Sequence, residues 1–499
     1  MTALPAKGQG AGMNLIDRVV MALSPEAGLR RLRHRQAAMN YEAAAYSTGI
    51  GYRRAPATDA DAAAARRGRL GYLARDATRN DPLAARALQV ITNNVVGDGI
   101  IPRPDPKHPG LVTPFLELTE SFLDTTSIDA NGLQNLYGLQ RLVMSTVAAA
   151  GEAIVLRHPA PPGAPGLPLR LQVLEPDHLD MSRDSMAKRG GGYVHEGISY
   201  DQKGRRTGYW LYDHHPGSTA PHLAGARSRF WPARDVLHVY RPDRPGQMRG
   251  VSWFAPIILD LQHLSDYAEA QLMRQKIAAC FAGFRTITDH HRPDRERELE
   301  ALSPGLIQDL GPDEEITFTD PPEAGDYDPF VRAIVRHVAA GLGITYEALS
   351  GDLSTVNFSS ARMGRMEMDR NISAWQWTML IPAMLQPLGQ WIVAAWAQTD
   401  ARVARLVAEG KPPVIGWVPP HRVLVDPTRE IPALREAVAA GFTSRRAVVR
   451  SLGHDPERLE QDIAGENAVA DKLGLVFLSD GRVAATAAAE PSQEGRNDA

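Results

Sequence analysis

The side chains best suited to metal or acid–base chemistry in this sequence are its histidines, and their spacing does not favour a metal site. His214 and His215 are adjacent, as are His290 and His291. Neighbouring residues on a strand or helix point in different directions, so neither pair is expected to chelate a metal ion. His214 and His222 could do so only if folding brought them together near acidic residues, and a solvated loop is the simpler interpretation.

Acidic residues and the single cysteine give no stronger sign of catalysis. Acids and arginines alternate between positions 289 and 300, which indicates an exposed helix face of mixed charge and not a two-metal nuclease site. Cys280 lies among apolar neighbours, where a buried structural thiol is expected. The sequence also lacks a Walker-type phosphate loop and a Gly-x-Ser-x-Gly nucleophile elbow. We therefore expect no catalytic centre, no cofactor and no bound metal.

A polar loop after position 350 is the most informative segment of the chain. Gly341 and Gly343 break a helical segment, the loop follows, and a helix rich in Met and Trp begins after it. Ser and Asn side chains form hydrogen bonds with the nearby backbone, which favours turns and helix caps. A capped connection between two helices is thus the simplest interpretation. Val356 and Phe358 would nevertheless be costly to expose there unless another surface covers them.

The composition is that of a large soluble globular protein. The 499 residues suffice for two or three domains, and the contents of 43% hydrophobic and 23% charged residues are ordinary. No apolar run approaches the roughly 20 residues that span a bilayer. Asp17 and Arg18 interrupt the apolar stretch near the N-terminus, so we expect no signal peptide and a cytoplasmic location. The formal net charge of -3 excludes a protein that grips DNA through overall basicity.

Hydrophobic periodicity predicts helices at both ends of the chain and a sheet between them. The N-terminal helices are expected at residues 14–41, 62–96, 116–124 and 133–150, with Asp81 and Pro82 starting a helix inside the second. β-branched and aromatic runs predict a mainly antiparallel sheet from residues 153–158, 169–174, 208–213 and 236–240. Near the C-terminus, three short helices are expected to begin at Asp426, at Thr443 or Ser444, and at Asp455, and to form a compact bundle.

Two helices before the polar loop carry apolar residues at three- and four-residue steps. The first, residues 256–281, would extend about 39 Å at roughly 1.5 Å per residue. The second, residues 327–342, follows an acidic and Pro-rich segment. The apolar positions are Ile257, Leu261, Leu264, Ala268 and Leu272 on the first helix and Phe330, Ile334 and Val338 on the second.

A long helical stretch, residues 361–397, follows the polar loop. Pro382 and Pro387 lie within it, and each is expected to kink or break the helix because proline lacks an amide donor. Its sulfur-containing and aromatic side chains are predicted to be core and not a cofactor-binding set. They are Met363, Met366, Met368, Trp375, Trp377, Trp391 and Trp396.

The order of several motifs resembles that in the lambda family of bacteriophage portal proteins. GLGITYEALSGDLSTVNFSSAR, residues 341–362, is similar to the channel loop of that family. Similar segments follow the family's order elsewhere: LARDATRNDPLAARALQVITNNVVGDGI at 73–100, LQVLEPDHLD at 171–180, GISYDQKGRRTGYWLYDHHP at 197–216, PARDVLHVYRPDRPGQMRGVSWFAPII at 232–258 and DPTREIPALREAVAAGFTSRRAVVRSLGHDPERLEQDIAGE at 426–466. Together they cover most of the chain, and their order is more specific than any one of them.

The resemblance implies an α+β portal-protein fold with an α/β wing, long stem helices, a small clip insert and a helical C-terminal crown, assembled as a ring. The expected boundaries are a disordered N-terminus at 1–13, the wing at 14–250, the first stem helix at 251–281, the clip at 282–326, the second stem helix at 327–350, the channel loop at 351–361, a kinked helix and return to the wing at 362–425, crown helices at 426–475 and a tail at 476–499.

The resemblance also implies roles for particular residues. The two apolar stripes would form the stem interface between subunits. Residues of the clip would contact the terminase or an adaptor, namely Asp294, Arg295, Arg297 and Glu298. The loop would face DNA through Asp352, Leu353, Ser354, Thr355, Val356, Asn357, Phe358, Ser359 and Ser360.

The implied function is a ring, usually of twelve subunits, that forms a channel at one capsid vertex and takes part in head assembly. Double-stranded DNA would pass through without sequence specificity during packaging and ejection, and a near-neutral chain suits such sliding. Implied partners are other copies of the chain, the terminase large subunit, the major capsid or scaffolding protein and a head-completion or adaptor protein, with no membrane. The chain would be found in the host cytoplasm during assembly and then in the virion. A metal-dependent DNA-processing enzyme and a capsid scaffolding protein without a channel remain alternatives.

Overall fold

The computed structural model of the protein describes residues 59–63, 66–185, 191–219, 227–279, 283–287, 314–318, 327–354, 356–420 and 426–477. The chain divides into a unit from Met1 to Ala63, in which α3 (Ala60–Ala63) is described, and a unit from Ala64 to Ala499. All further description concerns the second unit. The helix expected at 14–41, the clip residues 294–298, the expected disordered N-terminus and residues 478–499 of the expected tail lie outside the described residues.

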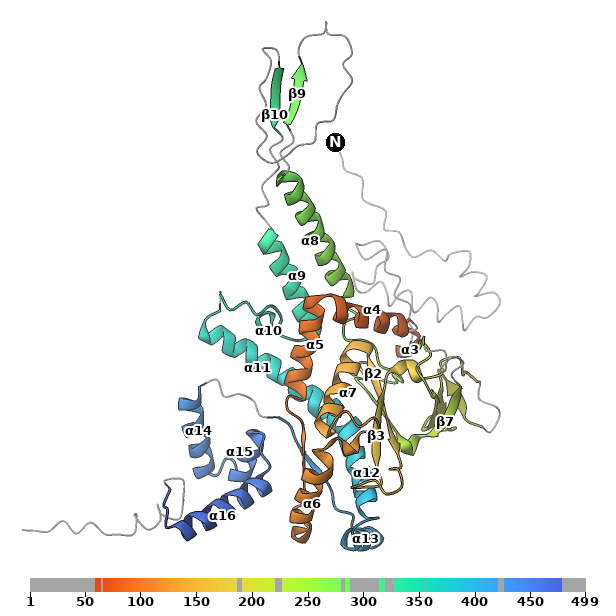
Figure 1. Ribbon diagram of the computed structural model, residues 1–499, viewed down its shortest axis with the longest axis vertical. Coiled ribbons are helices and arrows are strands. Elements are labelled where there is room, and N and C mark those ends of the chain that lie inside the picture. The colour runs from red at the N-terminus through yellow and green to blue at the C-terminus, as the bar shows by residue number, and fades with distance from the viewer. Residues whose placement is uncertain are drawn as a thin grey trace, which may run out of the picture. The chain divides into compact units, whose positions relative to one another are not determined.

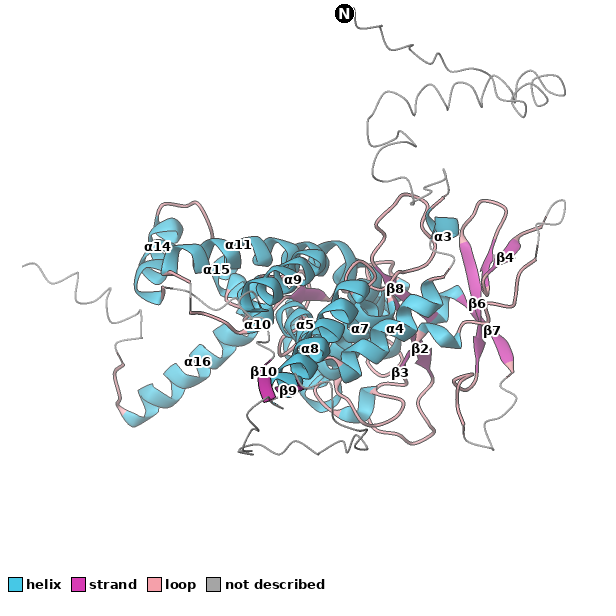
Figure 2. Cartoon of the chain, turned by 90° about the horizontal axis from the view of Figure 1, so that it is seen from above, coloured by secondary structure: helices cyan, strands magenta, loops and turns pink. Residues whose placement is uncertain are grey.

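Three helices near the start of this unit pack together: α4 (Arg67–Asn80), α5 (Pro82–Val95) and α7 (Leu136–Ala150) (Figure 2). The predicted start of α5 is confirmed, because the Asp81 carboxylate accepts hydrogen bonds from the amides of Leu83 and Ala84 at 2.8 and 2.9 Å. Gly151 ends α7 with φ +98°. A Cβ there would lie 2.5 Å from the Val251 backbone, so this turn requires glycine.

Short elements connect α5 to α7. They are β1 (Ile101–Arg103), a 3-10 turn at Pro109–Leu111, α6 (Val112–Leu118), a π-helical turn at Thr119–Leu123 and a 3-10 turn at Thr126–Ile128. β1 pairs antiparallel with β11 (Gly416–Val418), a strand more than 300 residues later in the chain. This pairing joins the segment that follows α5 to the segment that follows the last helices of the core.

The predicted strands form, but they belong to two sheets and not to one. The first sheet has the order β3-β2-β8, all antiparallel, and the second has the order β4-β5-β6-β7, also antiparallel. The bounds are β2 (Glu152–His158), β3 (Arg170–Leu174), β4 (Tyr193–His195), β5 (Ile198–Tyr200), β6 (Arg206–Tyr212), β7 (Ser228–Pro232) and β8 (Val236–Tyr240). A small apolar cluster that includes Ile154, Leu156 and Leu211 joins the two sheets. Runs of apolar residues predict strands but not which strands pair.

Two helices follow the sheets and lie side by side (Figure 1): α8 (Ile258–Ala279) and α9 (Tyr327–Leu342). Between them in sequence, β9 (Gly283–Ile287) and β10 (Glu314–Phe318) pair antiparallel, with Glu314 opposite Ile287. The predicted order of helix, insert and returning helix is therefore present in the described residues.

The long helical stretch does not break at its prolines. α11 (Phe358–Trp375) passes into a π-helix at Gln376–Leu385 that contains Pro382, and α12 (Gln386–Trp396) begins with Pro387 in its first turn. A π-turn shifts the hydrogen-bond pattern, and a first-turn proline needs no amide donor, so both residues are tolerated without a break. By length and composition alone Ser359–Trp396 could cross a membrane, but 61% of its most apolar window is buried inside the fold.

The core prediction for this stretch is correct in part. Met368, Trp375, Trp391 and Trp396 are buried in the main apolar cluster, which extends from Ala74 to Trp417. By contrast, three of the predicted core side chains are exposed, namely Met363, Met366 and Trp377. The apolar content of α11 thus exceeds what its buried face requires.

The C-terminal helices begin where predicted but do not form a compact bundle. They are α14 (Pro427–Ala439), α15 (Arg445–Ser451) and α16 (Pro456–Leu473), and they follow α13 (Ala401–Ala408). Ser444 caps α15 and Asp455 caps α16 through side-chain oxygens. Neither α14 nor α15 buries a residue in the single chain. A helix cap depends on neighbouring residues and can be predicted from the sequence. A bundle core requires the apolar faces of several helices to pack against one another.

The Asp81 cap gives a direct test of the α4–α5 junction. Asp81→Ala should lower the free energy of unfolding by about 1 kcal/mol, because two amides at the start of α5 lose their acceptor. Asp81→Asn keeps a side-chain oxygen and serves as the matched control. Chemical denaturation of both variants checks this, and equal losses would show that the cap is not what stabilises α5.

Candidate functional site

The polar loop begins with a turn that two polar side chains fix. α9 ends at Leu342, and Gly343 adopts φ +69°, where the Asn371 side-chain amide donates to its carbonyl at 2.9 Å. Thr345 then caps the short helix α10 (Tyr346–Ser350) by accepting from the Ala348 amide at 3.2 Å. Gly343 and Thr345 therefore form the turn and the cap that their residue types predict. Gly341 does not break the helix as expected: it lies inside α9, where a Cβ would come within 2.5 Å of the Ile257 side chain.

Asp352 organises the exposed part of the loop. Its carboxylate accepts from the Ser354 amide at 3.0 Å and the Ser354 hydroxyl at 2.6 Å, and the Tyr346 hydroxyl donates to it at 3.3 Å. The hydrogen bond from the Ser354 side chain is the main reason that the pKa of Asp352 lies below its ordinary value. Asn357 ends the loop by accepting from the Ser360 amide at 2.8 Å, which caps α11.

The loop is thus a capped connection whose polar residues satisfy one another, as the simplest interpretation of the sequence predicted. The large apolar side chain of Leu353, by contrast, is 67% exposed. Val356 is half-buried, and the Thr355 residue and the Phe358 side chain lie outside the described part of the chain. Whether these residues face DNA stays a prediction.

The eight predicted stem-interface residues fall into two groups. Ile257, Leu261, Leu264 and Val338 are buried in the chain's own core, so the expectation that they face a neighbouring subunit needs correction. The reason is that the first half of α8 packs against α9 and α4 of the same chain. Further along, Leu272 is 52% exposed and Phe330 is 44% exposed. Ala268 and Ile334 are half-buried.

A buried ion pair that the sequence gave no sign of joins the first sheet to the segment that leads into α8. The Glu152 carboxylate accepts from Arg249 Nε at 2.8 Å, from His238 Nε2 at 2.9 Å and from the Gly250 amide at 2.8 Å. All three side chains are buried. Arg249 also reaches Glu196 at 3.2 Å, and Glu196 pairs with Arg67 of α4.

The electrostatics of this site fix its charge states. Burial works to raise the pKa of Glu152, but the charge of Arg249 and the hydrogen bond from His238 outweigh it, so the pKa lies well below its ordinary value. Burial lowers the pKa of His238 to about 4, although Glu152 opposes the shift. At neutral pH the site therefore holds an ionised glutamate, a charged arginine and a neutral histidine that donates to the glutamate.

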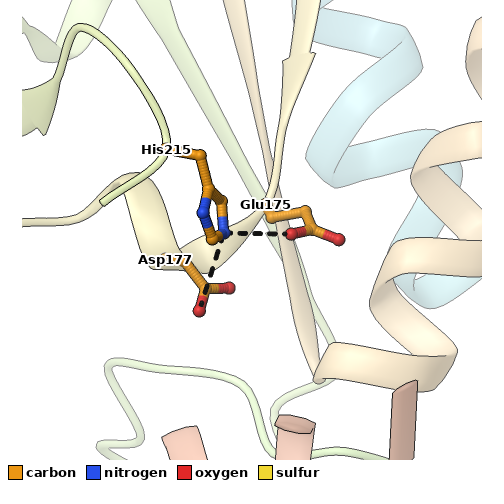
Figure 3. Close-up of side chains that lie close together, drawn as sticks. All are labelled: Glu175, Asp177 and His215. Carbon is orange, nitrogen blue, oxygen red and sulfur yellow. Dashed lines mark ion pairs between the residues drawn. The ribbon is translucent and has the colours of Figure 1, made fainter. Parts of the chain in front are cut away.

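A second polar cluster brings together Glu175, Asp177 and His215 (Figure 3). One possible ligand atom from each residue lies within 4.8 Å of those of the other two. Among the described residues, this is the group of three His, Cys, Asp or Glu side chains close enough to hold a metal ion. His215 Nε2 lies 3.4 Å from a Glu175 oxygen and 4.0 Å from an Asp177 oxygen. Sequence spacing pairs His215 only with its neighbour His214, because the two acids lie about 40 residues earlier in the chain.

Arg75 pairs with both acids of this cluster. Its guanidinium donates two hydrogen bonds to Asp177 at 2.7 and 3.0 Å and lies 2.7 Å from Glu175. Burial works to raise the pKa of Asp177, but Arg75 outweighs it and the pKa lies below its ordinary value. The cluster therefore joins α4, the turn after β3 and the turn after β6 through ion pairs, and a metal ion there would meet a guanidinium in contact with both carboxylates.

Comparison with known proteins gives the family. Residues 48–376 match the model of the phage portal proteins of the lambda family, a span that includes α4 to α11 and both stem helices. The chain therefore belongs to the lambda family of phage portal proteins. Its function is that of a phage portal, and the family is a structural one.

Individual relatives are distant. The chain is 25% identical over 369 residues to the "Probable portal protein" of Halomonas phage phiHAP-1, covering 70% of this chain and 68% of that protein. It is 22% identical over 308 residues to portal protein B of Escherichia phage lambda, covering 53% and 56%. A chain from the neck of a native GTA particle computed with C12 symmetry superposes with a TM-score of 0.45 at 14% identity, over 77% of this chain and 93% of that one.

His238 makes stability depend on pH. Its pKa is lower in the folded chain than in the unfolded one, so the unfolded chain binds more protons, and stability is lost as the pH falls from about 6.5 to about 4. His238→Gln keeps a donor near Glu152 without the titration and should flatten this part of the profile, in which one group contributes at most about 1.4 kcal/mol per pH unit. Denaturation from pH 4 to 7 measures it, with the exposed His337→Gln as control. An unchanged slope would contradict the assignment.

Proposed function

We propose that this portal protein assembles head-to-tail into a closed ring of about twelve copies, in which α8, α9 and the polar loop of each copy surround a channel for double-stranded DNA. The family match over residues 48–376 is the observation that carries the proposal, because it includes all three of these elements. The side chains of Leu272, 52% exposed, and Phe330, 44% exposed, support it, since both leave apolar surface open to solvent in the single chain, although the Phe330 ring packs against that of Tyr267.

The charge of the chain fits a channel through which DNA slides. A protein that neutralised many phosphates would release many counterions and hold the duplex in place. The 55 basic and 58 acidic residues nearly balance, so the walls of a ring need not grip the backbone. In this arrangement Asp352, Leu353 and the residues up to Ser360 face the channel, and Leu353 is the exposed apolar residue that could contact a neighbouring loop or the duplex.

Other components supply the chemistry. The terminase large subunit hydrolyses ATP, and the clip residues Asp294, Arg295, Arg297 and Glu298 contact the terminase or a head-completion or adaptor protein. The major capsid or scaffolding protein surrounds the ring at one vertex of the virion. The ring forms in the host cytoplasm before it enters the capsid, and the chain acts as a structural component.

Replacing one exposed stem residue tests the ring. Leu272→Asp should leave the chain folded but prevent ring formation, because the charge would be buried against a neighbouring copy. Leu264→Asp should instead destabilise the chain itself by several kcal/mol, since Leu264 lies in its own core. Gln275→Asp, at an exposed polar position of α8, is the matched control. Negative-stain microscopy and light scattering of the purified proteins decide, with unfolding curves for stability. Normal rings from Leu272→Asp, or a stable monomer of the natural chain, would contradict the proposal.

Removing the loop tests the channel role. Deletion of Ser354 to Phe358 removes no residue of the described core, so folding and ring assembly should persist while the amount of DNA retained in the capsid falls and terminase ATPase activity remains. Replacing the same five residues with a Gly-Ser segment is the control, because it restores the connection but not the side chains. Full-length genomes packaged at normal yield by both variants would refute a channel role.

A further inference from the structure

The first turn of α16 contains two acids in contact with each other and nearly removed from solvent. Asp455 is 5% exposed and Glu457 is 8% exposed, and their side chains interact directly. Each carboxylate also has one oxygen, Oδ1 of Asp455 and Oε2 of Glu457, that is buried without a hydrogen-bond donor. Two ionised carboxylates in such a site repel each other, whereas one proton placed between them supplies the missing donor.

The surroundings of the pair come from three parts of the chain. Glu457 lies 3.7 Å from Arg103 of β1 and 3.6 Å from Arg446 of α15. Arg446 also pairs with Glu460 at 2.6 Å, one turn further along α16. The Asp455 carboxylate accepts from the Arg458 amide at 3.3 Å, and the Arg458 guanidinium pairs with Glu120 of the π-helical turn at 3.2 Å. The positive charges of the two guanidinium groups beside the acids disfavour a bound metal ion there.

This contact is a main attachment of the C-terminal helices to the rest of the chain. α14 and α15 bury no residue, and in α16 the buried residues are Pro456, Glu457 and Ala470. Elsewhere α14 approaches the body through Arg362 and Glu430, which lie 3.8 Å apart and are both partly exposed. The attachment therefore depends on a buried polar contact and not on a large apolar one.

We propose that the proton shared by Asp455 and Glu457 holds the start of α16 against β1 and the π-helical turn at Thr119–Leu123, and that loss of this proton releases the C-terminal helices. The device would let the helices move while the core of the wing stays folded. It does not depend on the ring or the channel, so it stands or falls separately from the proposed function.

The direction of the pH effect follows from proton linkage. Burial is the main reason that the pKa of Asp455 is raised from 3.8 to about 7, and contact with Glu457 adds to it. The attached state therefore binds the proton more tightly than the released state, and attachment weakens as the pH rises between about 4 and about 7. One linked proton changes the attachment equilibrium by at most about tenfold per pH unit.

Hydrogen–deuterium exchange of the full-length protein between pH 5 and 8 tests the proposal. Protection factors of α16 should fall with rising pH by up to about tenfold per unit until about pH 7, after correction for intrinsic exchange, while those of the core helix α7 should not fall, since the loss of the His238 proton stabilises the core as the pH rises. Asp455→Asn supplies a permanent amide donor and keeps an N-cap oxygen, so protection of α16 should become independent of pH. Asp426→Asn, at the start of α14, should keep the natural slope.

Glu457→Gln serves if Asp455→Asn does not fold, since its amide can donate to Asp455 and should also remove the pH dependence. Two results would overturn the proposal: protection of α16 in the natural protein that does not fall as the pH rises, or a slope in the folded asparagine or glutamine variant equal to the natural one.

Discussion

The buried contact of Glu152 with Arg249 and His238 is the constraint on which the rest of the structure depends. It joins β2 and β8 to the segment that enters α8, and through Glu196 it reaches Arg67 of α4. Removing one partner would leave a charge in a dry site, at a cost of about 3–5 kcal/mol. The direction in which the stem helices leave the sheet is therefore set by electrostatics as well as by apolar packing.

The polar loop, by contrast, is held in place by hydrogen bonds between residues close together in the sequence. Asp352, Asn357 and Thr345 each bind backbone amides within a few residues, so the loop keeps its form without contacts from a distant core. A loop with such local hydrogen bonds can extend into a channel and still keep one backbone conformation. Leu272, Phe330 and Leu353 are among the large apolar side chains that stay exposed in the single chain.

Local chemistry and periodicity were sufficient to predict much of the fold. The cap at Asp81, the limits of α9, the starts of α15 and α16 and four of the strands follow from side chains that act on their own neighbourhood. The family resemblance rested on the order of such segments, and the family match supports it. The loop's turns were predictable for the same reason, since glycine, serine and asparagine act within a few residues.

By itself the sequence determined which segments become helices or strands and to which family the chain belongs. The tertiary structure alone decided which apolar stripe is core and which is surface, so Leu264 and Leu272, eight residues apart on one helix, have opposite environments. It also decided the division into two sheets and the π-helix that accommodates Pro382. The contacts of Glu152 with Arg249 and of Asp455 with Glu457 depend on burial, which a periodic pattern does not encode.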